Sequence, residues 1–163
     1  MDTKFQKLTF YIANLSPNFI RRKYFSLINL CPPSTSICRG LFIDEPSHVK
    51  IGENGYINHN VQFTIGWNDN ASVTIGNNVF IAPNVCFYCV SHNIGESLQR
   101  AGKNRYSSIN VEDGVWIGAN AVVLQSVTIG KGSIICAGAV VNRNIPANEM
   151  WGGVHARFIK KLD

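Results

Sequence analysis

Charged side chains are scarce in this sequence of 163 residues: Asp, Glu, Lys and Arg together make up only 15% of it. Long apolar runs are also missing, and without 18 consecutive apolar residues no transmembrane helix is expected. Residues 1–30 lack the apolar core and the cleavage site of a signal peptide, so we expect a cytoplasmic protein. Five cysteines are an odd number, which argues against a fully paired disulfide framework and favours reduced thiols.

The positive charge is confined to one part of the chain. The net charge is +5, and residues 1–40 account for all of it because residues 41–163 balance to zero. A uniformly basic, nucleic-acid-binding body is therefore disfavoured. The densest basic run, Arg21-Arg22-Lys23, lies between Phe19 and Phe25. We interpret this segment as a helical cap that packs its apolar side on the rest of the chain; the alternative is weak contact with an anionic membrane surface.

A six-residue repeat dominates the rest of the sequence. Blocks of six can be laid over residues 49–90 and 109–144, and in twelve of these thirteen blocks the third residue is aliphatic or Phe, the exception being Asp69. The first residue is Val or Ile in eight blocks, and the sixth is Asn or Gly in ten. A period of six fits neither an amphipathic helix nor an ordinary β-sandwich.

The physical meaning of the repeat follows from alternation along a strand. Residues one and three of a block point to the same side, so both can enter a core, while Asn and Gly at position six tolerate the left-handed backbone of a corner. A short strand followed by a corner every six residues predicts an all-β solenoid, a parallel β-helix that buries a continuous aliphatic column. In the geometry known for such repeats three blocks make one coil, and we therefore expect a triangular prism about four coils tall.

Several ordered motifs resemble those of the hexapeptide-repeat acyltransferases, in particular the maltose, galactoside and nodulation-factor O-acetyltransferase branch. They are Val73-Thr-Ile-Gly76, Val79-Phe-Ile-Ala-Pro-Asn-Val85, Ser91-His92, Val115-Trp-Ile-Gly118 and Val127-Thr-Ile-Gly130. The resemblance implies a left-handed parallel β-helix, a homotrimer with active sites between neighbouring subunits, and transfer of acetyl from acetyl-CoA. The left hand comes only from the resemblance, since the general rule for parallel crossovers would predict the right hand.

We expect a single domain with three parts. Residues 1–40 form a cap of two short helices and a linker, residues 49–145 form the β-helix, and residues 146–163 form a C-terminal tail. One stretch, residues 91–108, contains no repeat and is predicted to be a protruding loop without regular structure. A long polar excursion of this kind in a compact solenoid is usually functional.

His92 stands at the start of that loop and is the candidate catalytic residue. Acyl transfer to a hydroxyl needs a group that accepts the hydroxyl proton, and a neutral imidazole suits this task. The resemblance assigns the same role to His92 and implies direct attack on the thioester. A covalent route through Cys89 stays open from the residues alone; the motif Cys86-x-x-Cys89 is otherwise interpreted as ordinary packed thiols.

The donor site is predicted from an aromatic residue, a set of small residues and two cations. Trp116 faces outward between two core residues and is expected either to contact the ligand or to pack against another subunit. Arg157 and Lys160 could bind the CoA phosphates, although such residues are often simply solvated. The positions that match the family's groove for the pantetheine arm carry small residues: Gly118, Ala119, Ala137 and Gly138.

The acceptor site is predicted from the family register at Gln62, Asp69 and Asn70. These residues differ from the family's own choices, which leaves the acceptor's identity open. The leading hypothesis is an acetyl-CoA-dependent O-acetyltransferase acting on a sugar or glycan precursor, with acetyl-CoA as co-substrate and no bound metal. Alternatives are an N-acetyltransferase of an amino sugar, a serine O-acetyltransferase, or a catalytically silent β-helix that serves as a binding module. A zinc enzyme resembling γ-type carbonic anhydrase would need three clustered His ligands, which the spacing of the four histidines does not offer.

Overall fold

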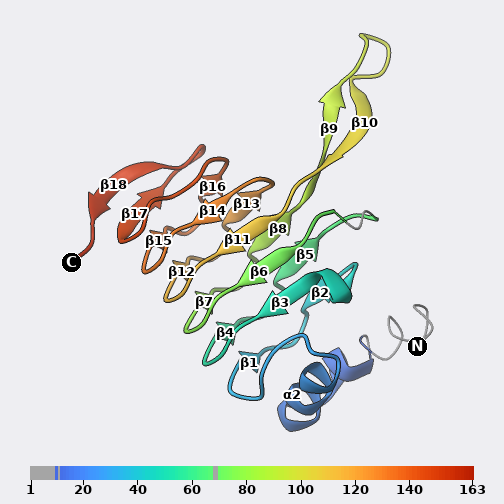
Figure 1. Cartoon of the computed structure of the whole chain (residues 1–163), viewed down its shortest axis with the longest axis vertical. Helices are drawn as coiled ribbons and strands as arrows, with labels where there is room; N and C mark the ends of the chain where they lie inside the picture. The colour runs from blue at the N-terminus through green and yellow to red at the C-terminus, as the bar shows by residue number, and fades with distance from the viewer. Residues whose placement is uncertain (1–9, 11, 68–69) are drawn as a thin grey trace.

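Short strands that wind through three parallel sheets form the body of the molecule (Figure 1). The computed structural model describes residues 10, 12–67 and 70–163. Sheet A contains β1 (Ser36–Ile37), β4 (Tyr56–Ile57), β7 (Phe80–Ile81), β12 (Trp116–Ile117), β15 (Ile134–Ile135) and β17 (Glu149–Gly152), with β18 (Arg157–Lys161) antiparallel at its edge. Sheet B contains β2 (Phe42–Ile43), β5 (Gln62–Thr64), β8 (Cys86–Tyr88), β13 (Val122–Leu124) and β16 (Val140–Val141). Sheet C contains β3 (Val49–Ile51), β6 (Val73–Ile75), β11 (Ile109–Val111) and β14 (Thr128–Ile129).

Consecutive strands of the body visit sheets A, B and C in turn, so three strands make one coil, as the repeat predicts. The first coil, however, begins at β1 and not at Val49. The β-helix therefore starts earlier than predicted, and the predicted height of about four coils is too low. Ile37 and Ile43 are already buried third residues of two earlier blocks. The short 3-10 helix Pro46–His48 breaks the six-residue phase before β3, and this shift conceals the first coil in the sequence.

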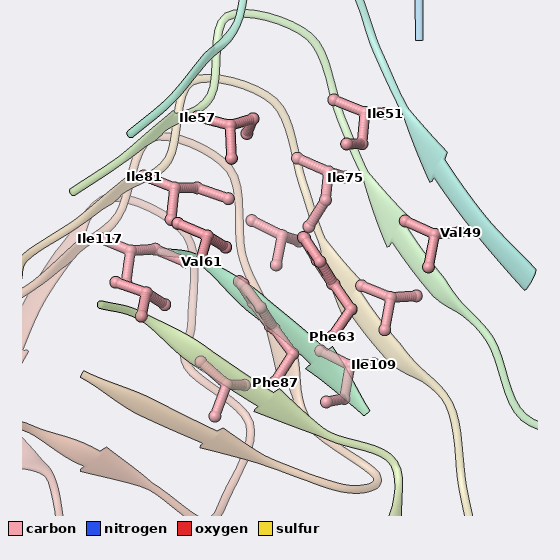
Figure 2. Close-up of a cluster of buried hydrophobic side chains, with 14 of the residues drawn as sticks. Val49, Ile51, Ile57, Val61, Phe63, Ile75, Ile81, Phe87, Ile109 and Ile117 are labelled. Carbon is pink, nitrogen blue, oxygen red and sulfur yellow. The ribbon is translucent and has the colours of Figure 1, made fainter. Parts of the chain in front are cut away.

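The core is the aliphatic column that the repeat predicts. All twelve apolar third residues of the blocks that start at Val49 are buried, and all eight Val or Ile residues at the first position are buried as well. Figure 2 shows Ile57, Ile81 and Ile117 one above another on successive coils. The rings of Phe63 and Phe87 stack with centroids 4.7 Å apart and an interplanar angle of 3°. Each fully buried side chain of this kind contributes about 1.5–3 kcal/mol.

The corners also follow the sequence prediction. The backbone is left-handed at Asn and Gly residues that end their blocks. Glycine and Asn tolerate this conformation, whereas β-branched residues do not. Along the corner between sheets A and B, the amide of Asn60 donates to Asn84 (3.3 Å) and that of Asn84 donates to Asn120 (3.2 Å). The corner residues with positive φ that the repeat identifies include Asn54, Asn60, Asn78, Asn84, Asn120, Gly132 and Gly138.

A helical segment lies at the β1 end of the coil (Figure 1). Residues 12–15 are helical, the chain bends at Ser16, and α2 (Asn18–Leu27) follows. The first part of the first helix predicted for the cap lies outside the described residues. Phe25 is fully buried and its ring lies 5.4 Å from that of Phe10, so one side of the segment packs on the core. Among the helices that the structure describes, none is long and apolar enough to cross a membrane.

Candidate active site

The polar stretch 91–108 is mostly a β-hairpin, which corrects the prediction of a loop without regular structure. Strand β9 (Val90–Ile94) pairs antiparallel with β10 (Ala101–Tyr106), and Figure 1 shows the hairpin projecting from the body between β8 and β11. Most of its side chains are exposed on both faces, so it lacks the apolar alternation by which a half-buried strand is recognised.

His92 lies on β9 with an exposed side chain. Its ring Nδ1 is 2.9 Å from the carbonyl oxygen of Gly102 on the facing strand. Because a carbonyl oxygen can only accept, Nδ1 carries the proton in this contact, and the neutral ring then has its lone pair on Nε2. The hairpin thus orients the imidazole and leaves Nε2 as the ring nitrogen that can accept a proton.

The base of the hairpin is anchored to the coils through residues that the sequence did not single out. The amide of Gln125 accepts two hydrogen bonds from the Arg105 guanidinium (2.9 and 2.7 Å) and donates to the Arg105 carbonyl (3.0 Å). A cavity of about 340 Å³ opens here, with Ser91 and Asn142 among its lining residues. Within one sequence these contacts give no signal, because Arg105 and Gln125 belong to different elements.

Of the predicted acceptor residues, Asn70 belongs to the connection that packs against the foot of this hairpin. Asn70 is exposed in the connection from β5 to β6, and Gln62 is exposed on β5, whereas Asp69 lies outside the described residues. The connection touches the hairpin directly: a Cβ at Gly66 would lie 2.6 Å from the Tyr106 ring and 3.3 Å from Cβ of Val90. The structure therefore brings Asn70 and His92 to the same corner, between sheets B and C.

The predicted donor residues lie elsewhere. Trp116 is on β12 in sheet A, and its indole is 54% exposed, as predicted for an outward position. Its neighbours in register are Phe80 on β7 and Ile134 on β15. Further along the same row are Met150 and Lys160, so one of the two predicted phosphate-binding cations shares a row with Trp116. Arg157 is exposed at the start of β18.

The four small residues predicted for the pantetheine groove come together at the corner between sheets A and B. A Cβ at Gly118 would lie 2.5 Å from the backbone nitrogen of Ala137, so only glycine allows this close stacking of coils. The backbone N–H of Gly138 donates to the carbonyl of Ala119 over 2.8 Å. Nothing lies within 4 Å of a Cβ built at Gly138, so the corner is open on its outer side.

Cys89 is poorly suited to act as a nucleophile. Its thiol is fully buried, and burial raises its pKa to about 12, with the carboxylate of Asp44 adding to the rise. A thiol acts as a nucleophile in its thiolate form, and the raised pKa makes the thiolate of Cys89 scarce near neutral pH. Cys86 and Cys89 are both reduced, and no group of His, Cys, Asp and Glu side chains in the described part of the chain could hold a metal ion.

In a single chain the two predicted halves of the site are separated. His92 and Asn70 belong to the corner between sheets B and C, whereas Trp116, Gly118 and Ala137 belong to sheet A and its corner with sheet B. One chain alone therefore does not place the candidate base beside the candidate donor groove.

Comparisons with known proteins identify the family. A model described as "Bacterial transferase hexapeptide (six repeats)" matches residues 108–143. The chain is 38% identical over 117 residues to galactoside O-acetyltransferase of Escherichia coli (strain K12), covering 72% of this chain and 56% of that protein. Three curated relatives are each covered over 54% to 67% of their own length.

Solved structures agree with this match over nearly the whole chain. A hexapeptide-repeat containing acetyltransferase from Vibrio cholerae superposes with a TM-score of 0.82 at 31% identity, covering 97% of this chain and 89% of that one. A galactoside acetyltransferase in complex with coenzyme A gives a TM-score of 0.80 at 31% identity, with 96% and 78% covered. The chain therefore belongs to the hexapeptide-repeat acetyltransferases.

Proposed function

We propose that this protein transfers acetyl from acetyl-CoA to a hydroxyl of a saccharide, with His92 as the general base. The observation that carries the proposal is the contact between Nδ1 of His92 and the Gly102 carbonyl, which leaves Nε2 able to accept a proton. The names of the relatives support the reaction class: one is a galactoside O-acetyltransferase and one solved structure holds coenzyme A.

In the proposed reaction, Nε2 of His92 accepts the proton of the acceptor hydroxyl as its oxygen attacks the thioester carbonyl carbon. The tetrahedral intermediate then collapses, the C–S bond breaks, and the departing CoA sulfur takes the proton from the imidazolium. The products are an acetyl ester and CoA thiol. Ala119 has no hydroxyl, so backbone N–H groups must stabilise the oxyanion.

The active site is proposed to form between two copies of the chain in a homotrimer of left-handed β-helices. The separation of the two half-sites within one chain supports this arrangement, because a hairpin that projects from the body can carry His92 to the donor corner of a neighbour. In this site, Trp116 and the small corner residues Gly118, Ala119, Ala137 and Gly138 hold the pantetheine arm. Arg157 and Lys160 bind the CoA phosphates.

The acceptor is proposed to bind beside the hairpin, with Gln62, Asp69 and Asn70 as hydrogen-bonding partners. Sugar hydroxyls are recognised by amides and carboxylates, which these residues offer. An amine acceptor, as in an amino sugar, or the hydroxyl of serine would use the same base and donor. To separate these cases, neutral saccharides, amino sugars and serine are each tested with acetyl-CoA, and the release of CoA thiol is measured.

A separate binding experiment tests whether the protein is an enzyme of this class at all. If titration calorimetry detects no binding of acetyl-CoA or CoA to the oligomeric protein, the alternative of a silent β-helix that acts as a binding module is favoured instead. Binding of CoA with turnover of any saccharide hydroxyl supports the proposal.

A second proposed contact is between the N-terminal segment and an anionic membrane surface. On the side of α2 away from the core, Phe19 is 74% and Leu27 is 73% exposed, and Lys23 is exposed on the same helix. Apolar side chains beside a cation favour an interface with anionic lipid. Vesicles with and without phosphatidylserine at low salt provide the test; equal absence of binding to both would end this idea.

A further inference from the structure

A basic pocket lies between the N-terminal helical segment and the first two coils, away from His92 and Trp116. It has a volume of about 390 Å³ and is lined by Arg21, Ser36, Ile37, Cys38, Arg39, Tyr56 and His59. Two of these residues belong to the group of basic side chains that gives the first 40 residues their positive charge. The lining that the structure describes includes no carboxylate.

Arg21 is the built part of this pocket, since its side chain is only 4% exposed. Its Nε donates to the Ile37 carbonyl (3.0 Å), and Nη1 donates to the carbonyls of Ser16 (2.7 Å) and Asn14 (3.4 Å). Among the described residues Nη2 has no hydrogen-bond partner, and Arg21 lines the pocket. Three donors are thus used to fix the guanidinium, and two remain for the open pocket.

The hydrogen bonds of Arg21 among the described residues go to neutral backbone carbonyls, which solvate its positive charge but do not balance it. Burial lowers the pKa of this guanidinium; the nearby Cys38 opposes the shift and Arg39 adds to it. A covered cation beside a second cation is costly unless an anion pairs with it. The pocket therefore has the electrostatic character of a site for a negatively charged group.

Arg39 and His59 occupy equivalent corner positions on successive coils. The carbonyl of Arg39 accepts from the N–H of Asn60 (3.1 Å), and the carbonyl of His59 accepts from the N–H of Asn84 (3.0 Å). The ring Nδ1 of His59 contacts Oδ1 of Asn58 at 2.8 Å, and since this oxygen only accepts, Nδ1 donates. Nε2 is then the ring nitrogen for a ligand: in the neutral ring it accepts from a P–OH group, and in the imidazolium it donates to a phosphate oxygen.

A further pair of side chains adds one donor to the pocket. The hydroxyl of Tyr56 and the thiol of Cys38 contact each other at 3.2 Å. Together with the two guanidinium groups they provide the cations and O–H or N–H donors that a tetrahedral phosphate accepts from.

The corner row that begins with Arg39 and His59 leads to the proposed donor groove. Its next members are Pro83, whose carbonyl accepts from Asn120 (3.0 Å), and Ala119, whose carbonyl accepts from Gly138 (2.8 Å). With neighbouring strands about 4.8 Å apart, His59 and Arg39 lie roughly 10 and 14 Å from Ala119 along the corner. The cations Arg157 and Lys160, proposed for the CoA phosphates, lie toward the opposite end of the coil.

We propose that this pocket binds a phosphate group carried by the acceptor, so that the substrate is a phosphorylated saccharide held at one end by Arg21, Arg39 and His59. Assigning the phosphate to the acceptor rests on the proposed transferase function. The reactive hydroxyl then lies toward the thioester, about two to three coils from the phosphate. CoA reaches the same thioester position from the other end.

The test uses the full-length oligomer and two independent measurements. Titration calorimetry with inorganic phosphate compares the wild type with Arg39→Ala, Arg39→Lys and Lys23→Ala, the last being an exposed cation that does not line the pocket. We expect binding to weaken about 10- to 100-fold in Arg39→Ala, the usual effect of removing a hydrogen bond to a charged group, to recover in part in Arg39→Lys, and to be unchanged in Lys23→Ala.

The second measurement compares hexose phosphates with the matching neutral hexoses as acceptors. We expect Arg39→Ala to raise KM for the hexose phosphate by a similar factor while KM for acetyl-CoA stays constant. Equal phosphate binding by the wild type and Arg39→Ala would overturn the pocket. A raised KM for acetyl-CoA alone would assign the phosphate to the donor and overturn the acceptor assignment. Because the phosphate titration needs no turnover, it distinguishes failure of the pocket from failure of the proposed transfer reaction.

Discussion

The ring Nδ1 of His92 lies 2.9 Å from the carbonyl oxygen of Gly102, across the two strands of a hairpin that projects from the coil. The contact joins two residues ten positions apart in the sequence, and its effect is chemical as well as structural. It holds the imidazole in one orientation and keeps Nε2 unprotonated in the neutral ring.

Removal of this imidazole should affect turnover far more than binding. His92→Ala is expected to lower kcat by about 10²- to 10⁴-fold, the usual contribution of a general base, while KM for acetyl-CoA changes little. His92→Gln, which keeps an N–H donor for the Gly102 carbonyl, should be equally slow because an amide accepts no proton. Leu98→Ala at the fully exposed hairpin tip is the control. Wild-type turnover in His92→Gln would contradict the assignment.

An active site shared between copies predicts complementation. His92→Ala and Trp116→Ala proteins, each nearly inactive, should regain activity when unfolded and refolded together. If the two half-sites come from different copies, about a quarter of the sites in a random mixture carry both intact residues. The double variant His92→Ala/Trp116→Ala mixed with itself is the control. No recovery in mixtures that do form mixed oligomers would place both residues of a site in one chain.

The two corner glycines of the donor groove should respond differently to alanine. At Gly118 the added Cβ would meet the backbone nitrogen of Ala137 at 2.5 Å, so we expect the coils to be forced apart at a cost of about 1–3 kcal/mol. At Gly138 the Cβ meets no atom within 4 Å, and the cost is the left-handed strain at φ +69°, about 1–2 kcal/mol. Gly138→Ala should therefore fold and raise KM for acetyl-CoA. Denaturant unfolding and steady-state kinetics check both expectations.

The stacked phenylalanines should dominate stability at the centre of the coil. Phe63 is fully buried against Phe87, and Phe63→Ala is expected to lower the free energy of unfolding by about 3–5 kcal/mol. Phe42 lies on β2, which pairs with the strand of Phe63, but Phe42 is 39% exposed. Phe42→Ala should therefore lower the free energy of unfolding much less. Equal losses of unfolding free energy in the two variants would mean that burial in the core column does not dominate the stability.

The five thiols should separate by reactivity. Burial raises the pKa of Cys31 to about 11 and that of Cys89 to about 12, so both remain protonated well above neutral pH in the folded protein. Labelling with iodoacetamide at pH 8 should modify Cys38, Cys86 and Cys136, which are partly exposed, before Cys31 and Cys89. Peptide mass mapping over time gives the order, and denatured protein serves as the control. Early labelling of Cys89 would contradict its burial.

Much of the body of the fold could be predicted from the sequence because its contacts are local and periodic. Val73 and Ile75 are buried since they are the first and third residues of one block, and Asn84 turns a corner since it ends another. The first coil could not be recognised, because the insertion at Pro46–His48 shifts the phase of Ile37 and Ile43 relative to the later blocks.

The sequence alone determined the repeat, the side of each strand that enters the core, and His92 as the candidate base, because each depends on residue type and spacing along the chain. Only the tertiary structure decided that His92 lies on a hairpin locked to Gly102, that Arg105 and Gln125 anchor this hairpin, and that Arg21, Arg39 and His59 line one pocket. These contacts join residues from different coils or elements. Their spacing in the sequence follows no period, and only the folded chain brings the groups within hydrogen-bonding distance or around a common cavity.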